Sequence, residues 1–312
     1  MPHKQQVSTT AGGRVRVGWC VGLTASVTLA PRAAECSTSI LQPAGPVAAS
    51  ERLVLLDALT IMLVIVVPTI IIALAFAWWF RASNRRARHL PDWDYSGQLE
   101  LLVWSIPALV IFFLGGVIWL GSHTLDPARP LRTAGPVLEV QVVSLDWKWL
   151  FIYPSQGIAS LDELVVPAGV PLHFTLTSAS VMNVFFVPQL GSMIYVMHGM
   201  VTQLNLQADR TGEFYGESAQ FSGDGFSDMH FVLRAVPAAA FTRWVEATHG
   251  GAPRLDRSAY GVLAVQSRNP APTTWRSIDP DLFQAIVTQQ LPPGPGPQSG
   301  RGSPAVHPQT RE

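Results

Sequence analysis

Thioether and imidazole side chains gather in one stretch of this 312-residue sequence, and such groups could together bind copper. Both are soft or borderline ligands that suit Cu(I). The residues concerned are Met193, Met197, His198, Met200, Met229 and His230. Methionines in a β domain more often fill space in the core, and no spacing here repeats as a metal-carrier motif would. Copper binding or delivery is therefore kept as an alternative function.

The two cysteines, Cys20 and Cys36, exclude several metal and redox classes. They form no C-x-x-C or C-x-x-C-H motif, so zinc ribbons, iron–sulfur clusters, c-type haem and a disulfide scaffold are excluded. Residues 33–36 (Ala-Ala-Glu-Cys) resemble a lipoprotein processing box, although Glu35 stands where a small side chain is normal. Cys36 is thus either lipidated or a free thiol without a role.

Two apolar runs, residues 58–80 and 101–121, contain no charged side chain. At about 1.5 Å per residue each is about 30 Å long, which is the thickness of the hydrocarbon core of a bilayer. Tryptophans near their ends are typical of membrane interfaces; they are Trp78, Trp79, Trp104 and Trp119. We predict two transmembrane helices.

The charges around these helices predict their orientation. The loop of residues 81–100 carries Arg81, Arg85, Arg86 and Arg88. The positive-inside rule places this loop in the cytoplasm and both termini outside. Residues 1–35, in which basic residues precede a short apolar run, are predicted to be a signal peptide. Residues 36–57 would then be an exported N-terminal segment, and residues 122–135 a linker.

From residue 136 to 237 the sequence changes to short runs with alternating polarity. Such runs predict strands, here at residues 137–143, 147–153, 171–178, 183–187, 201–208, 212–216 and 229–235. Seven or more short strands separated by turn residues indicate a Greek-key sandwich or barrel. We predict an all-β exported domain.

Residues 238–290 are predicted to form a short helical appendage. Residues 237–248 place Phe241, Trp244 and Val245 on one helix face. Residues 279–290 predict a second helix, with Asp279 as its N-cap and Pro280 at its first position. Residues 291–312 have few apolar side chains to bury, which predicts a disordered tail.

The overall composition excludes two broad classes of protein. Only 13% of residues are charged, whereas soluble domains carry about 25%, so an ordinary cytosolic enzyme is disfavoured. Residues 136–237 contain 3 basic and 9 acidic side chains, a net charge of −6. Nucleic-acid binding needs a concentrated positive face and is excluded. We interpret the acidic charge as a solvated surface.

Three motifs occur in an order that resembles subunit II of the haem–copper oxidases. They are residues 99–107 (Leu-Glu-Leu-Leu-Val-Trp-Ser-Ile-Pro), Trp147-Lys148-Trp149, and residues 212–216 (Gly-Glu-Phe-Tyr-Gly). The resemblance covers about residues 36–290. It implies a two-helix transmembrane hairpin, then a cupredoxin-like Greek-key β-sandwich and a short C-terminal helical appendage.

The resemblance also shows which copper ligands are missing. Cytochrome c oxidases hold a binuclear copper centre with a C-x-E-x-C-x-x-x-H-x-x-M loop and one upstream histidine. The matching positions here are Asn183, Ser218, Gln220, Ser222, Phe226 and Met229. Hydroxyls replace both thiolates and a phenyl ring replaces the loop histidine, whereas paired copper ions need soft anionic sulfur. We therefore predict no metal in this chain.

Residues 181–188 and 195–200 further resemble the branch without this centre, the bacterial cytochrome bo-type ubiquinol oxidases. This resemblance implies a subunit of a proton-pumping complex that oxidises ubiquinol and reduces oxygen to water. The haems and copper would belong to subunit I, and this chain would bind no cofactor and hold no catalytic residue.

Its partners would be subunit I, further membrane subunits and lipid. It would lie in the bacterial inner membrane, with its N-terminus and C-terminal domain in the periplasm. The alternative is a membrane-tethered copper-binding or copper-delivery cupredoxin.

Glu100 is the candidate for participation in turnover. The matching carboxylate in the oxidases marks the entrance of a proton path into subunit I. An interfacial carboxylate in contact with water is the alternative, because such residues are common at helix ends.

Trp147 and Trp149 match residues near copper in cytochrome c oxidases. Without copper we expect them to pack in the sandwich core or against the membrane subunit.

Overall fold

The computed structural model describes residues 40–88, 90, 92–131 and 135–294. The predicted signal peptide and Cys36 lie outside these described residues, as do residues 295–312 of the predicted tail.

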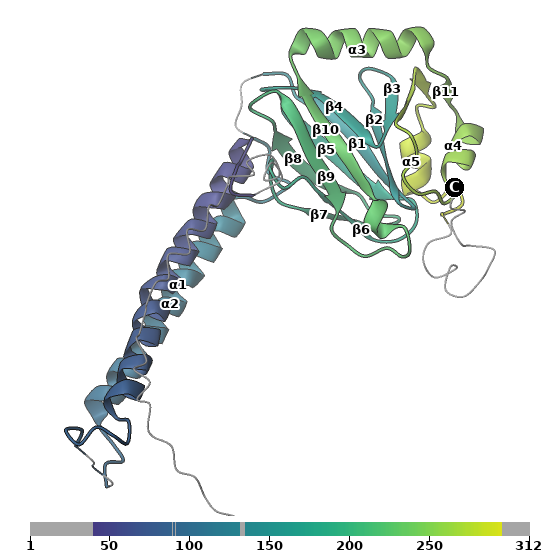
Figure 1. Cartoon of the computed structure of the whole chain (residues 1–312). Coiled ribbons are helices and arrows are strands. Elements are labelled where there is room, and N and C mark those ends of the chain that lie inside the picture. Colours follow the sequence, from purple (N-terminus) through teal and green to yellow (C-terminus); the bar gives the residue numbers. More distant parts are fainter. Residues whose placement is uncertain (1–39, 89, 91, 132–134, 295–312) are drawn as a thin grey trace, which may run out of the picture. The chain divides into compact units, whose positions relative to one another are not determined.

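Two long helices, α1 (Pro46–Trp79) and α2 (Gly97–Thr124), form the predicted hairpin (Figure 1). Both are apolar enough to cross a membrane, and the most apolar window of each is entirely unburied. Phe112 exposes 77% of its surface and Trp104 exposes 76%. Apolar surface of this extent is stable against lipid rather than water. The predicted membrane hairpin is confirmed.

Both helices are longer than the charge-free runs that predicted them. The first begins at Pro46, and not at residue 58, so most of the expected N-terminal segment is its first three turns. The second begins at Gly97 and continues to Thr124. Helical hydrogen bonds do not stop at the hydrocarbon boundary, and charged residues such as Glu51 and Asp57 are tolerated where the helix leaves the lipid.

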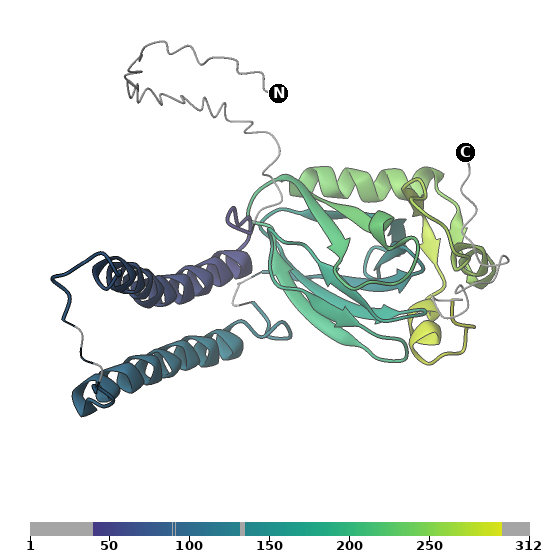
Figure 2. The same ribbon diagram turned by 60° about the horizontal axis from the view of Figure 1, so that its bottom comes forward.

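Two sheets form the β domain (Figure 2). The six-stranded sheet has the order β12-β3-β2-β1-β5-β8, and the five-stranded sheet has the order β4-β10-β9-β6-β7. The bounds are β1 Leu138–Leu145, β2 Lys148–Tyr153, β3 Ile158–Leu161, β4 Glu163–Pro167, β5 Pro171–Ser178, β6 Asn183–Phe186, β7 Ile194–Val196, β8 Thr202–Gln207, β9 Gly212–Ser218, β10 His230–Val236 and β12 Thr273–Trp275. The predicted β-sandwich is confirmed, with β3, β4 and β7 added to the expected strands.

The part of the six-stranded sheet formed by the end of β1, β2 and β3 is buried on both faces. Trp149 and Phe151 of β2 point into the core between the sheets. Leu150 and Ile152 of the same strand point into a second core on the outer face. A strand covered on both sides needs apolar residues throughout, which explains why β2 lacks a clear alternation of polarity.

The C-terminal appendage covers that outer face. It consists of α3 (Ala238–Gly251), β11 (Arg254–Leu255), α4 (Arg257–Leu263), β12, β13 (Ser277–Ile278) and α5 (Leu282–Val287). In both views α3 runs across one end of the sandwich (Figures 1 and 2). Its predicted apolar face, Phe241, Trp244 and Val245, packs against the core between the sheets. β12 pairs with β3, so the appendage extends the sheet itself.

The end of the appendage differs from the prediction in two details. The helix begins at Leu282 with Asp281 as N-cap, and not at Asp279, because Asp279 caps the preceding turn by accepting from the Asp281 N–H at 3.3 Å. Residues 291–294 are ordered against the domain, since Leu291 packs on the second core and the Gly294 N–H donates to the Ala179 carbonyl at 3.0 Å.

Candidate functional site

The positions that match copper ligands in relatives meet at one end of the five-stranded sheet. Asn183 begins β6, Ser218 ends β9 and Met229 directly precedes β10. Because β9 lies between β6 and β10, the sheet brings these three distant residues together. Each of the three is 4% exposed or less.

A chain of hydrogen bonds joins these side chains. The Asn183 Nδ2 donates to Ser144 Oγ at 2.7 Å, and the Asn183 Oδ1 accepts from Ser218 Oγ at 3.1 Å. Ser144 belongs to β1 of the other sheet, so this Ser144–Asn183–Ser218 network bridges the sandwich. Buried polar groups that satisfy one another hold a single arrangement. Ser144 carries no sequence signal for this role, because nothing in a strand shows which residue faces it from another sheet.

The loop between β9 and β10 carries the remaining positions. The Gln220 carbonyl lies 3.4 Å from Ser218 Oγ, which donates toward it. Ser222 is buried, with its hydroxyl 3.9 Å from the sulfur of Met229. Phe226 packs edge to face on Phe221, with ring centroids 5.6 Å apart. The contacts that these loop residues make are therefore between neutral polar groups or between apolar side chains.

This set of side chains does not fit a binuclear copper centre. Such a centre needs thiolates to bridge its ions and imidazoles to complete it. The side chains present are two carboxamides, two hydroxyls, one thioether and one phenyl ring. The Asn183 carboxamide and the Ser218 hydroxyl are already hydrogen-bonded to each other.

Trp147 holds the loop in place. Its indole Nε1 donates to the Ser222 carbonyl at 3.0 Å. The ring lies directly against Gly225, where a Cβ would come within 2.3 Å of it. The Arg268 guanidinium of the appendage lies 5.8 Å from the ring centroid on the face of Trp147. Trp147 is 4% exposed and Trp149 fully buried, so both pack within the sandwich as expected.

Two family models and several relatives match this chain. Residues 140–236 match the family Cytochrome C oxidase subunit II, periplasmic domain, and residues 250–294 match the COX Aromatic Rich Motif. The chain is 43% identical to ubiquinol oxidase subunit 2 of Acetobacter aceti, over 88% of each chain. It is 44% identical to cytochrome bo(3) ubiquinol oxidase subunit 2 of Pseudomonas aeruginosa, over 81% of this chain and 77% of that one. The chain belongs to the ubiquinol oxidase subunit 2 family.

More distant members share the same span. Quinol oxidase subunit 2 of Bacillus cereus is 31% identical over 72% of this chain and 78% of its own length. The match to the aromatic-rich motif coincides with the part of the appendage that follows α3. The resemblance inferred from the sequence motifs is thus confirmed.

A buried charged cluster connects the appendage to the end of the β domain at which the copper-position residues lie. Lys148 is 2% exposed, and its Nζ donates to the Val265 carbonyl at 2.6 Å and to Ser267 Oγ at 2.7 Å. Asp146 accepts from the Gln266 amide at 3.1 Å. Residues 265–267 are therefore bound to the β1–β2 turn, next to Trp147. We call Asp146, Lys148 and Asp162 with residues 265–267 the Lys148 cluster.

Burial shifts the pKa values within the Lys148 cluster in opposite directions. Desolvation lowers the pKa of Lys148 to about 8, against the charges of Asp162 and Asp146, which raise it. Desolvation raises the pKa of Asp162 to about 7, against the Trp149 N–H, which donates to it at 2.6 Å, and the charge of Lys148. A lysine inside an apolar strand was the sequence signal for this cluster, but Val265 and Ser267, which accept from its ammonium, lie over 100 residues away.

The methionine and histidine residues of the copper alternative do not gather at one point. Met193 precedes β7 and His230 begins β10, which are three strand positions apart, or about 14 Å. His230 stacks on Tyr215 instead, with centroids 5.8 Å apart, and Met229 is buried in the core. Met193 and Met200 are each about half exposed. Within the described ranges no three His, Cys, Asp or Glu side chains are grouped to hold a metal ion.

Glu100 lies in the first turn of α2, next to the arginine-bearing loop. Its backbone N–H donates to the Ser96 carbonyl at 3.0 Å, and its side chain is exposed. A carboxylate held on the first turn of a helix is favoured by the helix dipole.

Proposed function

We propose that this chain works as subunit II of a proton-pumping ubiquinol oxidase in a bacterial inner membrane, with its N-terminus and β domain in the periplasm. The complex oxidises ubiquinol and reduces oxygen to water, and its haems and copper reside in subunit I. The Ser144–Asn183–Ser218 network, found where cytochrome c oxidases hold copper, carries the proposal. Ubiquinol delivers electrons from within the membrane, so an exported copper relay is not required. This chain then binds no metal and serves subunit I as a structural partner.

We expect the complex, purified from detergent-solubilised membranes through this chain, to contain haem in its optical spectrum and no copper attributable to this chain. The same chain produced alone should contain no stoichiometric copper, because its side chains offer no thiolate or imidazole pair. Two copper ions per chain would contradict the proposal. Binding of Cu(I) by the chain alone, without a haem-bearing partner, would instead favour the copper-delivery alternative.

We also propose that Glu100 forms part of the cytoplasmic entrance of a proton path into subunit I. Its exposed position in the first turn of α2, beside the loop with four arginines, supports this role. A carboxylate there can collect protons from cytoplasmic water and pass them to a neighbouring subunit.

A Glu100→Gln variant of the assembled oxidase is expected to consume oxygen and take up protons about tenfold more slowly, equivalent to about 1.4 kcal/mol in the barrier. Glu100→Asp should retain most of the activity, because it keeps the carboxylate. Asp94→Asn, in the same loop, serves as the control for a general change of surface charge. Unchanged rates in Glu100→Gln would leave Glu100 as an interfacial carboxylate only.

Cys36, if residues 1–35 are removed, would be the first residue of the mature chain. We propose lipidation at this cysteine, and the mass of the mature N-terminal peptide distinguishes a lipidated from a free thiol.

A further inference from the structure

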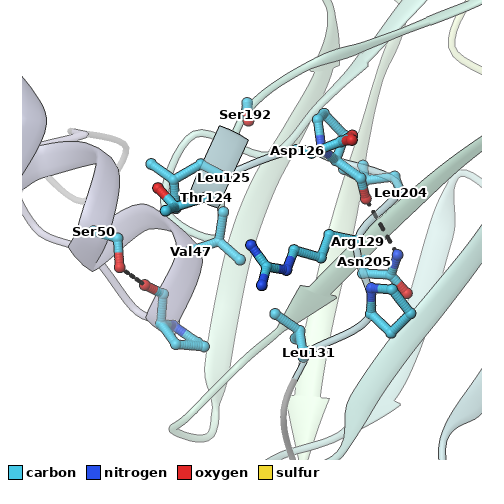
Figure 3. A pocket seen from close by; sticks show the side chains of 13 residues that line it. Val47, Ser50, Thr124, Leu125, Asp126, Arg129, Leu131, Ser192, Leu204 and Asn205 are labelled. Carbon is cyan, nitrogen blue, oxygen red and sulfur yellow. Dashed lines mark hydrogen bonds between the residues drawn. The ribbon is translucent and has the colours of Figure 1, made fainter. Parts of the chain in front are cut away.

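A pocket of about 360 Å³ lies where the outer ends of α1 and α2 meet the β domain (Figure 3). Three parts of the chain line it: the first turn of α1, the end of α2 with the segment that follows, and the β domain at Ser192, just before β7, and at Leu204 and Asn205 in the middle of β8. The side chains that line it include Val47, Thr124, Asp126, Arg129 and Leu131.

Hydrogen bonds between these parts hold the pocket in shape. The Ala48 N–H donates to the Leu190 carbonyl at 3.2 Å, and Ser192 Oγ donates to Glu51 at 2.5 Å. On the other side, the Asn205 N–H donates to the Pro127 carbonyl at 2.9 Å. The pocket is therefore built by contacts that tie both helix ends to the domain.

The pocket lies at the level of lipid headgroups. Thr124 follows the apolar run of α2, which ends at residue 121, by three residues, or about 5 Å of helix. The polar layer on each side of the hydrocarbon core is about 5–7 Å thick. The side of the pocket formed by α2 is thus within reach of the phosphates of the outer leaflet.

Charges of both signs line the pocket. The Arg129 side chain projects into it between Val47 and Leu131 (Figure 3). One of its five N–H donors binds the His123 carbonyl at 3.3 Å, and Arg129 takes part in neither ion pair of the described chain. Asp126, with its Oδ1 accepting from the Ala128 N–H at 3.0 Å, supplies a negative charge at the same site. A guanidinium matches a phosphate and a carboxylate matches an ammonium.

We propose that this pocket binds the headgroup of a phospholipid that carries both a phosphate and an ammonium, as an ethanolamine lipid does. The phosphate lies against Arg129 and the ammonium against Asp126, while Val47 and Leu131 contact the glycerol and first acyl carbons. This inference concerns residues remote from the copper positions, and it holds or fails independently of the proposed function.

Native mass spectrometry of the assembled complex tests the proposal. Wild-type complex transferred into phosphatidylethanolamine nanodiscs is expected to retain one such lipid on this subunit. Arg129→Gln should lower that retention at least tenfold, whereas Arg210→Gln, in the turn before β9, should leave it unchanged. Equal retention by wild type and Arg129→Gln would overturn the proposal.

Two further measurements distinguish an ethanolamine lipid from another anionic lipid and from free phosphate. Phosphatidylglycerol, which lacks the ammonium, is expected to bind at least fivefold more weakly, and this difference should vanish in Asp126→Asn. Millimolar inorganic phosphate should not displace the lipid. Displacement by phosphate alone, or equal binding of the two lipids by the wild type, would show a general anion site and refute the headgroup assignment.

Discussion

A Lys148→Met variant of the full-length chain is expected to have a free energy of unfolding about 3–5 kcal/mol lower than that of the wild type. The substitution keeps an unbranched apolar side chain but removes the ammonium, which interacts with the charges of Asp146 and Asp162 and donates to the Val265 carbonyl and Ser267. Removing the ammonium leaves the desolvated carboxyl groups without the opposite charge beside them, and it leaves the Val265 carbonyl without its donor. Denaturant unfolding in detergent, followed by tryptophan fluorescence, measures the loss.

The control for this variant removes a single hydrogen bond from the same cluster. Ser267→Ala deletes one acceptor and leaves the charges in place, so its cost should be about 1 kcal/mol. If Lys148→Met were as stable as Ser267→Ala, the buried charge would contribute nothing to holding the appendage. In Lys148→Met the rate of hydrogen exchange should increase more in residues 265–268 than in β1 or β5. This segment loses the hydrogen bonds from Lys148 that hold it to the domain.

The second large effect is a dependence of stability on pH that originates at Asp162. Its pKa rises from 3.8 to about 7 on folding, so the folded chain holds the proton more tightly than the unfolded chain. The stability that comes from this group is fully present below about pH 4 and is lost as the pH rises to about 7. The expected loss is about 2–4 kcal/mol, reduced from the full linkage by the partial exposure of the side chain.

Asp162→Asn should flatten the stability profile between about pH 4 and pH 7. Asparagine keeps the acceptor for the Trp149 N–H and tolerates the positive φ of 53° at this position. Glu246→Gln, which removes an exposed carboxylate on α3, should retain the wild-type profile. A wild-type profile in Asp162→Asn would assign the pH dependence to other groups.

The Lys148 cluster links the appendage to the end of the sandwich where cytochrome c oxidases hold copper. The Lys148 cluster binds residues 265–267, and the neighbouring Arg268 covers Trp147, which in turn holds Ser222 and Gly225. The aromatic-rich appendage is thus connected to the copper-position loop through Asp146, Trp147 and Lys148 at the β1–β2 turn.

The sequence by itself determined the membrane hairpin, the β-sandwich and the family. Charge-free runs long enough to span lipid are local signals, and so are alternating strands and the motif around Gly212–Ser218. The identity of the residues at the copper positions is also local, because a serine or phenylalanine cannot supply a thiolate or imidazole in any fold. The apolar face of α3 followed directly from helical periodicity.

Only the tertiary structure decided how the copper-position residues are used and what anchors the appendage. Ser144 faces Asn183 from the other sheet, and Lys148 meets Val265 and Ser267 across more than 100 residues. Such partners are set by the packing of separate segments, and periodicity or spacing within one segment carries no record of what will lie against it.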